Sequence, residues 1–357
     1  MPSPAARPKI GDQVLPGDRP PRGGPGHPPV PRGRVGVVIA NLGTPDSTGY
    51  WAMRRYLNEF LSDRRVIDMS PWFWQPLLQL VILTRRPFTS GAAYRRIWNR
   101  DLDESPLLTI TRNQARLLSE VFAKDRRIVV EYCMRYGHPS IDSMFRVVRD
   151  RGCERILFFP LYPQYAAPTT ATANDQAFSS LMTMKWQPAV RTVPAYHDHP
   201  LYIEALGRSV LETLGEAKPD ALVLSFHGLP ERYLAEGDPY HCQCQKTARL
   251  LTDWLGWDSE RVVTAFQSRF GREEWLKPYS VEAVARLARD GRRRIAVMAP
   301  GFAADCVETL EEIQEEIRDS FEAAGGEAFT YIPCLNDSPA HIRLLAEIVR
   351  TELSGWI

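Results

Sequence analysis

The chain has 357 residues, 44% hydrophobic and 24% charged, which is enough for one large or two ordinary domains with buried cores. The formal net charge of +1 gives no support to nucleic-acid binding. The 6 cysteines do not resemble a disulfide framework, so a reducing compartment is expected. No apolar run approaches the ~20 residues of a membrane-spanning helix, which predicts a soluble or, at most, peripheral protein.

Residues 1–33 differ in composition from the rest of the chain. They are rich in Pro and Gly, carry scattered Arg and show no apolar period, which predicts a disordered tail. The segment has no continuous hydrophobic core, so we do not expect it to be a secretory signal.

From Val35 onward, short apolar runs alternate with helix-length amphipathic segments. Continuous Val, Ile, Leu and Phe runs separated by helices are typical of parallel strands that are buried on both faces. Strands are predicted at 34–42, 126–133, 154–162, 189–196, 220–226, 261–268, 293–300 and 327–334. The pattern predicts an α/β fold with doubly wound parallel sheets.

The chain also repeats itself. The stretch 37–46 (VVIANLGTPD) aligns without a gap on 222–231 (LVLSFHGLPE). In the same order, 128–137 aligns on 262–271, and 151–159 resembles 290–298. Three matches in order predict two similar α/β halves. The first half is longer, because it carries an insertion at about 50–100 that includes the apolar stretch 69–87.

The two halves differ at one position that matters for chemistry. Leu42 stands in the first half where His227 stands in the second, directly after a predicted strand. Ligands of open α/β sheets bind at the carboxyl ends of the strands. His227 is therefore a candidate functional residue, although its ring could equally form a structural hydrogen bond within the turn.

A second candidate is Glu308, in the first turn of a predicted helix. Asp305 and Glu308 have the spacing of a capping box, and Glu308, Glu312 and Glu316 fit a solvated acidic face. Both structural explanations stay open. If Glu308 instead faces His227 across a strand-end cleft, the pair could bind a divalent cation or take protons from a substrate. Neither a dinucleotide-binding GxGxxG motif after a strand, nor a Walker A motif, nor a nucleophile elbow is present.

At these residues the chain resembles the ferrochelatases, which insert Fe(II) into a porphyrin. The resemblance covers residues 34–352. The motifs that carry it are NLGTPD (41–46), YRRIW (94–98), SPLLTIT (105–111), MRYGHPSI (134–141), LYPQY (161–165), SFHGLPERY (225–233), GDPYHCQC (237–244), FQSRFGREEWLKP (266–278) and DCVETLEEI (305–313).

The resemblance implies two Rossmann-like halves, each a parallel sheet flanked by helices, with a porphyrin cleft between them. The first half is expected at 34–162, completed by a C-terminal helix in 336–357, and the second at 163–335.

The resemblance also implies roles for individual residues. His227 becomes a metal ligand or acceptor of pyrrole protons, with Glu308 as its carboxylate partner. Glu312 and Glu316 are expected to continue a path for metal or protons. The residues expected to contact the porphyrin are Leu42, Arg135, Tyr136 and Trp275.

The stretch 69–87 corresponds to a hydrophobic lip, which in some relatives touches a membrane. Its predicted lip residues are Trp72, Phe73, Trp74 and Leu77. The alternative for this stretch is an ordinary buried helix. Peripheral contact with the inner membrane surface by an otherwise cytoplasmic protein is the corresponding expectation.

No cofactor is expected to be required, and Fe(II) enters as a substrate. Position 306 is Cys where many ferrochelatases carry His. The iron–sulfur cluster of the animal enzymes takes three ligands from a C-terminal extension. We do not expect that cluster here. Cys242 and Cys244 form a CxC pair of their own, and Cys133 or Cys153 could join them. Two ligands are half a site, so reduced thiols are favoured over a [2Fe-2S] cluster.

The resemblance therefore predicts a lyase that converts protoporphyrin IX and Fe(II) to protohaem. One alternative is a chelatase for another metal or tetrapyrrole, such as cobalt or coproporphyrin. Another is a non-catalytic porphyrin- or haem-binding protein on the same scaffold. Retention of both His227 and Glu308 argues against the last alternative, because binding a ring needs neither.

Overall fold

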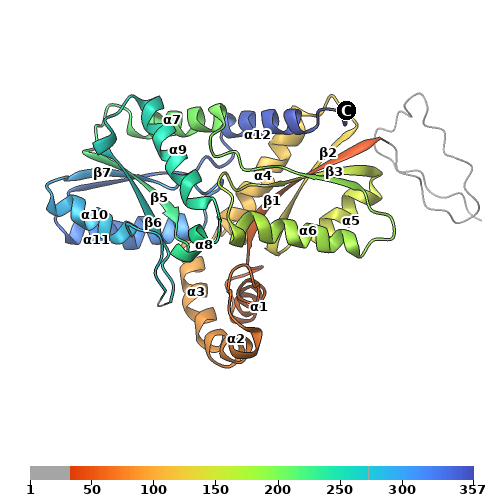
Figure 1. Cartoon of the computed structure of the whole chain (residues 1–357), viewed down its shortest axis with the longest axis horizontal. Coiled ribbons are helices and arrows are strands. Elements are labelled where there is room, and N and C mark those ends of the chain that lie inside the picture. Colours follow the sequence, from red (N-terminus) through yellow and green to blue (C-terminus); the bar gives the residue numbers. More distant parts are fainter. Residues whose placement is uncertain (1–32, 272) are drawn as a thin grey trace, which may run out of the picture.

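The computed structural model describes residues 33–271 and 273–357. The predicted tail, apart from its last residue, lies outside the described residues. The rest of the chain forms two parallel sheets that lie side by side, each flanked by helices (Figure 1). This arrangement confirms the predicted fold class.

The two sheets have the same strand order. The first is β2-β1-β3-β4 and the second is β6-β5-β7-β8, with every neighbouring pair parallel. Their bounds are β1 Arg34–Thr44, β2 Ile128–Gly137, β3 Cys153–Pro160, β4 Ala189–Thr192, β5 Ala221–His227, β6 Val262–Gln267, β7 Arg294–Met298 and β8 Ala328–Ile332. Each predicted strand is present, and the equal order accounts for the internal repeat.

Helices cover both faces of the sheets. They are α1 Tyr50–Leu61, α2 Pro71–Leu77, α3 Leu83–Ile97, α4 Pro106–Val121, α5 Ile141–Asp150, α6 Thr172–Met182, α7 Pro200–Leu214, α8 Glu231–Ala235, α9 Tyr240–Leu255, α10 Ser280–Arg289, α11 Arg318–Ala323 and α12 Pro339–Glu352. Three π-helical segments are η1 Leu78–Ile82, η2 Ala167–Ala171 and η4 Glu308–Ile317, and η3 Ser259–Arg261 is a 3₁₀ turn. Helices α4 and α12 both begin with a Ser-Pro pair whose serine side chain accepts a backbone N–H, the residue types preferred at these positions.

The boundary predicted between the two halves, after residue 162, is wrong for strand β4. β4 pairs with β3, so the first sheet extends to Thr192. The C-terminal helix α12 packs against both α4 and α7. The residues that follow it contact the first sheet, because the Arg155 guanidinium donates to the Trp356 carbonyl at 2.5 Å and Arg191 lies 4.5 Å from the Trp356 ring centre.

The insertion in the first half forms a projecting arm (residues 50–97), built from α1, α2, η1 and α3 (Figure 1). The arm has a small core of its own, to which Met53, Leu57, Trp74 and Leu83 contribute. Its base reaches the first sheet through Tyr136, which is fully buried in the same cluster.

Helix α12 is held in place by a buried histidine, His341, whose Nδ1 donates to the Asn336 carbonyl at 2.5 Å. Burial lowers the pKa of His341 to about 4, against about 6.5 in an unfolded chain. The unfolded state therefore binds more protons between these values, and stability is lost as the pH falls through this window. From pH 7 to pH 5, this residue should lower the free energy of unfolding by about 2 kcal/mol.

Urea unfolding of the wild type and of His341→Gln at both pH values measures this contribution. The free energy of unfolding should fall less between pH 7 and pH 5 in the variant than in the wild type, because glutamine does not titrate. An equal decrease of the free energy of unfolding in the two proteins would contradict this contribution of His341.

Candidate active site

A cavity opens between the two halves, at the carboxyl ends of β1, β3, β5 and β7. Together with its open mouth it holds about 1310 Å³ of empty space. Its walls are mainly apolar and aromatic, and they come from both halves and from the arm. Strand-end cavities of this kind are where open α/β sheets bind ligands.

His227 lines this cavity at the last position of β5. Its Nδ1 lies 2.7 Å from the Gly228 carbonyl oxygen. A carbonyl oxygen can only accept, so Nδ1 carries a proton, and in the neutral imidazole the lone pair is then on Nε2. The structural hydrogen bond considered for this residue is present. It also fixes the tautomer that leaves Nε2 able to accept a proton or bind a metal ion.

Glu308 lines the same cavity and begins the π-helix η4. Long π-helical segments are rare, and short ones occur often at functional sites. The capping-box alternative is not what forms: the Asp305 carboxylate accepts from the side chains of Thr309, Tyr331 and Asn336 instead. Helix η4 is held to the arm by Arg96, which contacts the carboxylates of Glu311 and Glu315.

Glu312 lies one turn further along η4. Its carboxylate accepts from the Ser268 N–H at 2.7 Å, the Ser268 hydroxyl at 2.5 Å and Gln267 Nε2 at 3.1 Å. Burial raises the pKa of Glu312, and the charge of Glu308 adds to this, while the Ser268 and Gln267 hydrogen bonds and His227 oppose it. Two acids and the histidine therefore influence one another electrostatically.

Glu316, the last of the predicted acids, is exposed and does not line the cavity. The three glutamates thus lead from the cavity wall through a half-buried position to the surface. Among residues 33–271 and 273–357, no group of three or more His, Cys, Asp or Glu side chains is arranged to hold a metal ion.

Sequence reasoning missed Gln267. It pairs with His227 in the β5–β6 register and accepts from the Ser225 hydroxyl at 2.7 Å. Its Nε2 donates to the Glu308 carbonyl at 2.8 Å as well as to the Glu312 carboxylate. Gln267 therefore ties the histidine strand to the acidic helix. Its place at a strand end next to His227 was the signal that could have found it.

Leu42 and Trp275 both line the cavity, and their contact with a porphyrin stays a prediction. The Trp275 ring centre lies 6.5 Å from that of His227, and its Nε1 is buried without a hydrogen-bond partner among the described residues. Tyr56 and Tyr94 of the arm also line the cavity, and the charge of Glu308 contributes to raising the pKa of both, after the larger effect of burial. No pattern in the sequence singled out Tyr56, and Tyr94 stood out only as the first residue of the YRRIW motif.

Arg135 and Tyr136 were expected to contact the porphyrin, and that expectation needs correction. Neither side chain lines the cavity. Both donate to the same carboxylate oxygen of Asp63, at 2.5 Å and 2.8 Å respectively. Their polar atoms are engaged in the wall behind the cavity, where the guanidinium also lies 4.3 Å from the Tyr136 ring centre.

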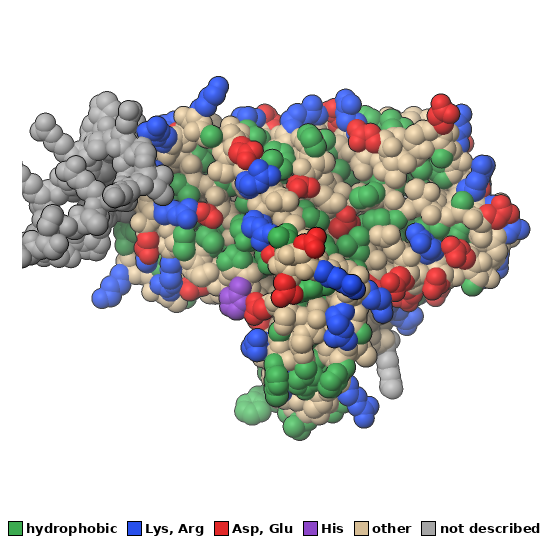
Figure 2. Space-filling view, turned by 180° about the vertical axis from the view of Figure 1, so that it is seen from behind, with side chains coloured by type: hydrophobic (Ala, Val, Ile, Leu, Met, Phe, Trp, Pro, Cys, Tyr) green, Lys and Arg blue, Asp and Glu red, His purple; other side chains and the backbone are tan. Residues whose placement is uncertain are grey.

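The predicted lip is only partly exposed. Trp72 and Phe73 are 88% and 78% exposed, and Leu77 is exposed as well. Trp74 is buried, and its Nε1 donates to the Leu61 carbonyl at 2.6 Å, so the prediction is wrong for this residue. These residues belong to α2, which lies at the end of the arm (Figure 1), and Figure 2 shows hydrophobic side chains gathered there.

The CxC cysteines point in different directions. Cys242 and Cys244 are two positions apart on α9, where side chains do not share a face. Cys242 is exposed and Cys244 is fully buried, with burial raising the pKa of its thiol. Cys133 and Cys153 lie in a separate core, under the first sheet. The four do not form one ligand set.

The ferrochelatase family model matches residues 34–353. A ferrochelatase of Rhodobacter capsulatus is 61% identical over 336 residues, which span 93% of this chain and 96% of the relative. The chain belongs to the ferrochelatase family. Its members act on a porphyrin and ferrous iron, which makes the chain a metal chelatase, a lyase, as predicted.

A second ferrochelatase, from Rhizobium meliloti, is 56% identical over 93% of this chain and 98% of its own length. Among solved structures, SirB from Bacillus subtilis with Fe3+ is similar with a TM-score of 0.53 and 13% identity. The match covers 90% of this chain and 97% of SirB. At that identity it shows the two-half fold alone.

Proposed function

We propose that the chain inserts Fe(II) into protoporphyrin IX, with His227 as the acceptor of pyrrole protons and Glu308 as its partner. The observation that carries this proposal is that His227, whose Nδ1 donates to the Gly228 carbonyl, and Glu308 line the same mainly apolar cavity. The apolar and aromatic walls suit a flat macrocycle.

The chemistry balances with these groups. Two pyrrole N–H bonds break, the iron binds all four ring nitrogens, and two protons leave without any change of oxidation state. His227 Nε2 takes the two ring protons one after the other, and each then passes to the carboxylates of Glu308 and Glu312. The succession from Glu308 through Glu312 to exposed Glu316 supports a path from cavity to solvent.

The test is an anaerobic assay in which Fe(II) and protoporphyrin IX are mixed with the protein and haem is measured by absorbance. Coproporphyrin III and Co(II) are offered in parallel reactions. Fastest turnover with Fe(II) and protoporphyrin IX is expected. Faster turnover of coproporphyrin or cobalt would make the chain a chelatase for that substrate, and porphyrin quenching without any product would identify a carrier.

We also propose that the end of the arm rests on the inner surface of a membrane, with the body in the cytoplasm. Six large hydrophobic side chains are exposed along α2, η1 and the residues next to them: Met69, Trp72, Phe73, Leu77, Leu80 and Val81. Exposed apolar clusters of this kind mark interaction sites. No helix among residues 33–271 and 273–357 is both long and apolar enough to cross a bilayer, so contact would be peripheral.

Replacing Trp72 and Phe73 by serine should lower binding to phosphatidylglycerol-containing vesicles by about tenfold or more, because each large side chain contributes about 1.5–3 kcal/mol when buried. Flotation with vesicles measures the bound fraction. Trp186→Ser, which changes an exposed tryptophan outside the arm, is the matched control. Equal binding of the double variant and the wild type would contradict the proposal.

A further inference from the structure

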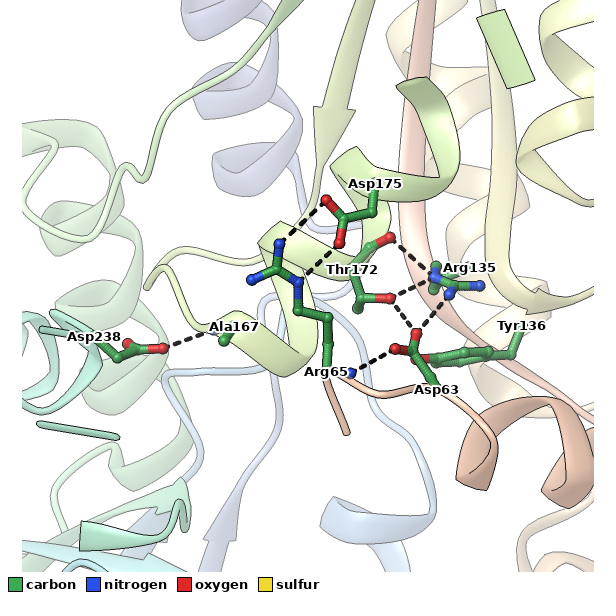
Figure 3. Close-up of polar contacts among 8 residues, drawn as sticks. All are labelled: Asp63, Arg65, Arg135, Tyr136, Ala167, Thr172, Asp175 and Asp238. Carbon is green, nitrogen blue, oxygen red and sulfur yellow. Dashed lines mark hydrogen bonds and ion pairs between the residues drawn. The ribbon is translucent and has the colours of Figure 1, made fainter. Parts of the chain in front are cut away.

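Asp63, in the turn that follows α1, is the centre of a polar cluster behind the cavity wall (Figure 3). One of its carboxylate oxygens, Oδ2, accepts from the Arg135 guanidinium at 2.5 Å, from the Tyr136 hydroxyl at 2.8 Å and from the Thr172 hydroxyl. The other, Oδ1, accepts from the Arg65 N–H at 2.7 Å. Arg135 Nε also donates to the Thr172 carbonyl at 3.1 Å. Asp63, Arg135 and Thr172 therefore form a closed triangle.

The triangle is nearly shielded from water. The Asp63 and Arg135 side chains are 9% and 12% exposed. Burial by itself would raise the pKa of Asp63, but the hydrogen bonds from Thr172, the Arg65 N–H and Tyr136, with the charge of Arg135, lower it below its usual value. The carboxylate is thus ionised and fully engaged. Ion pairs that are buried this well stabilise a structure only where the geometry satisfies both partners.

The triangle joins three segments, and each one continues into the cavity. The Asp63 carbonyl accepts from the Val66 N–H at 3.1 Å, and Val66 lines the cavity. Thr172 begins α6 directly after η2, whose Pro168 and Thr169 line it too. On the third side, Tyr136 of β2 pairs with Gly43 of β1, another lining residue.

We propose that Asp63 is a positioning residue for the reaction: it sets the distance between the arm and η2, and so the width of the porphyrin cavity on this wall. The inference rests on the proposed function, because it takes the cavity to be the porphyrin site. It does not involve His227 or Glu308, which belong to the other half of the molecule. Asp63 should therefore govern how well the porphyrin is held, not the proton transfer itself.

A neighbouring contact offers a matched control. Arg65 donates to both carboxylate oxygens of Asp175 at 2.8 Å and 3.3 Å, so it also links the arm to α6 (Figure 3). This pair is about half exposed, at 46% and 50%, and neither residue lines the cavity. Exposed pairs contribute little. Asp175→Asn removes the same charge from the same two segments without touching the triangle.

The experiment compares Asp63→Asn, Thr172→Val and Asp175→Asn in the anaerobic iron assay, with separate titrations of protoporphyrin IX and Fe(II). Asp63→Asn should raise KM for the porphyrin about tenfold, which corresponds to about 1.4 kcal/mol, while kcat and KM for Fe(II) stay within about twofold. Thr172→Val removes a hydroxyl that donates to Asp63 and accepts from Arg135 Nε at 2.7 Å. The Thr172 carbonyl still accepts from Arg135, so no buried charge is stranded and the variant should fold even if Asp63→Asn does not. It should raise the same KM about threefold. Asp175→Asn should match the wild type.

A purely structural role would reduce the fraction of active protein, which lowers kcat and leaves KM for the porphyrin unchanged. That result in both Asp63→Asn and Thr172→Val, or equal effects of Asp63→Asn and Asp175→Asn, would overturn the inference. Absence of turnover in the wild type would instead refute the proposed function, so the two failures are distinguishable.

Discussion

Replacing His227 by alanine should lower kcat for iron insertion by about 10²–10⁴-fold, the usual contribution of a positioned general base. The ring loses its two pyrrole protons slowly unless a neutral base lies at its face. The Gly228 carbonyl accepts from Nδ1 of His227, so the neutral ring has its proton acceptor at Nε2. Porphyrin affinity should change by less than about threefold, since the remaining cavity walls stay in place.

The measurement is kcat under anaerobic conditions together with the porphyrin dissociation constant from fluorescence quenching. His138→Ala is the control, because that histidine is 75% exposed and contacts only Asp46 among the interactions described. Loss of porphyrin binding with unchanged kcat in His227→Ala would mean that the residue holds the ring and does not take its protons.

The second large effect is expected for Glu308→Gln, which should lower kcat by about 10²-fold or more. The substitution preserves size but removes the charge that accepts protons or draws the metal ion toward His227. Glu312→Gln should have a smaller effect, because its carboxylate already accepts hydrogen bonds from Ser268 and Gln267 that an amide can partly retain.

Glu322→Gln serves as the control for both, because Glu322 is exposed on α11, beyond the end of η4. Circular dichroism confirms that each variant is folded. A kcat of Glu308→Gln within about twofold of the Glu322→Gln value would assign Glu308 a helix-forming role only.

The fold could be predicted well because its signals are local. Buried parallel strands are continuous apolar runs in the sequence. The internal repeat indicated that the chain forms two similar halves, one after the other. The exception is the sheet to which β4 belongs: the strand itself was predicted, but its place at the edge of the first sheet was not. Its pairing with β3 depends on the path of the chain after 162, which no pattern within the strand reveals.

The site was predicted less completely, because side-chain direction depends on packing. His227 could be found from its place at a strand end and Glu308 from its place in the first turn of a predicted helix, and both line the cavity. The sequence could not reveal that the Arg135 side chain is directed away from the cavity, because its partner Asp63 is 72 positions away. The same limit explains Trp74, which follows two exposed aromatics in sequence yet turns into the core of the arm.

Helix η4 could not be foreseen either. The spacing of Asp305 and Glu308 fits an α-helical capping box, but the Asp305 carboxylate satisfies Tyr331 and Asn336 from distant segments. The chain then winds into a π-helix, with Glu308 as its first residue. Tertiary hydrogen bonds therefore override the local signal at the point where the candidate chemistry lies.

The central claim is that His227 removes pyrrole protons as Fe(II) enters the ring. Its most direct test is an anaerobic single turnover in weak buffer, in which protein loaded with protoporphyrin IX is mixed with Fe(II). Haem absorbance and a pH indicator are recorded together. We expect two protons released for each haem in the wild type, and both signals slowed about 10²–10⁴-fold in His227→Ala. Haem formation at the wild-type rate in the variant would contradict this account.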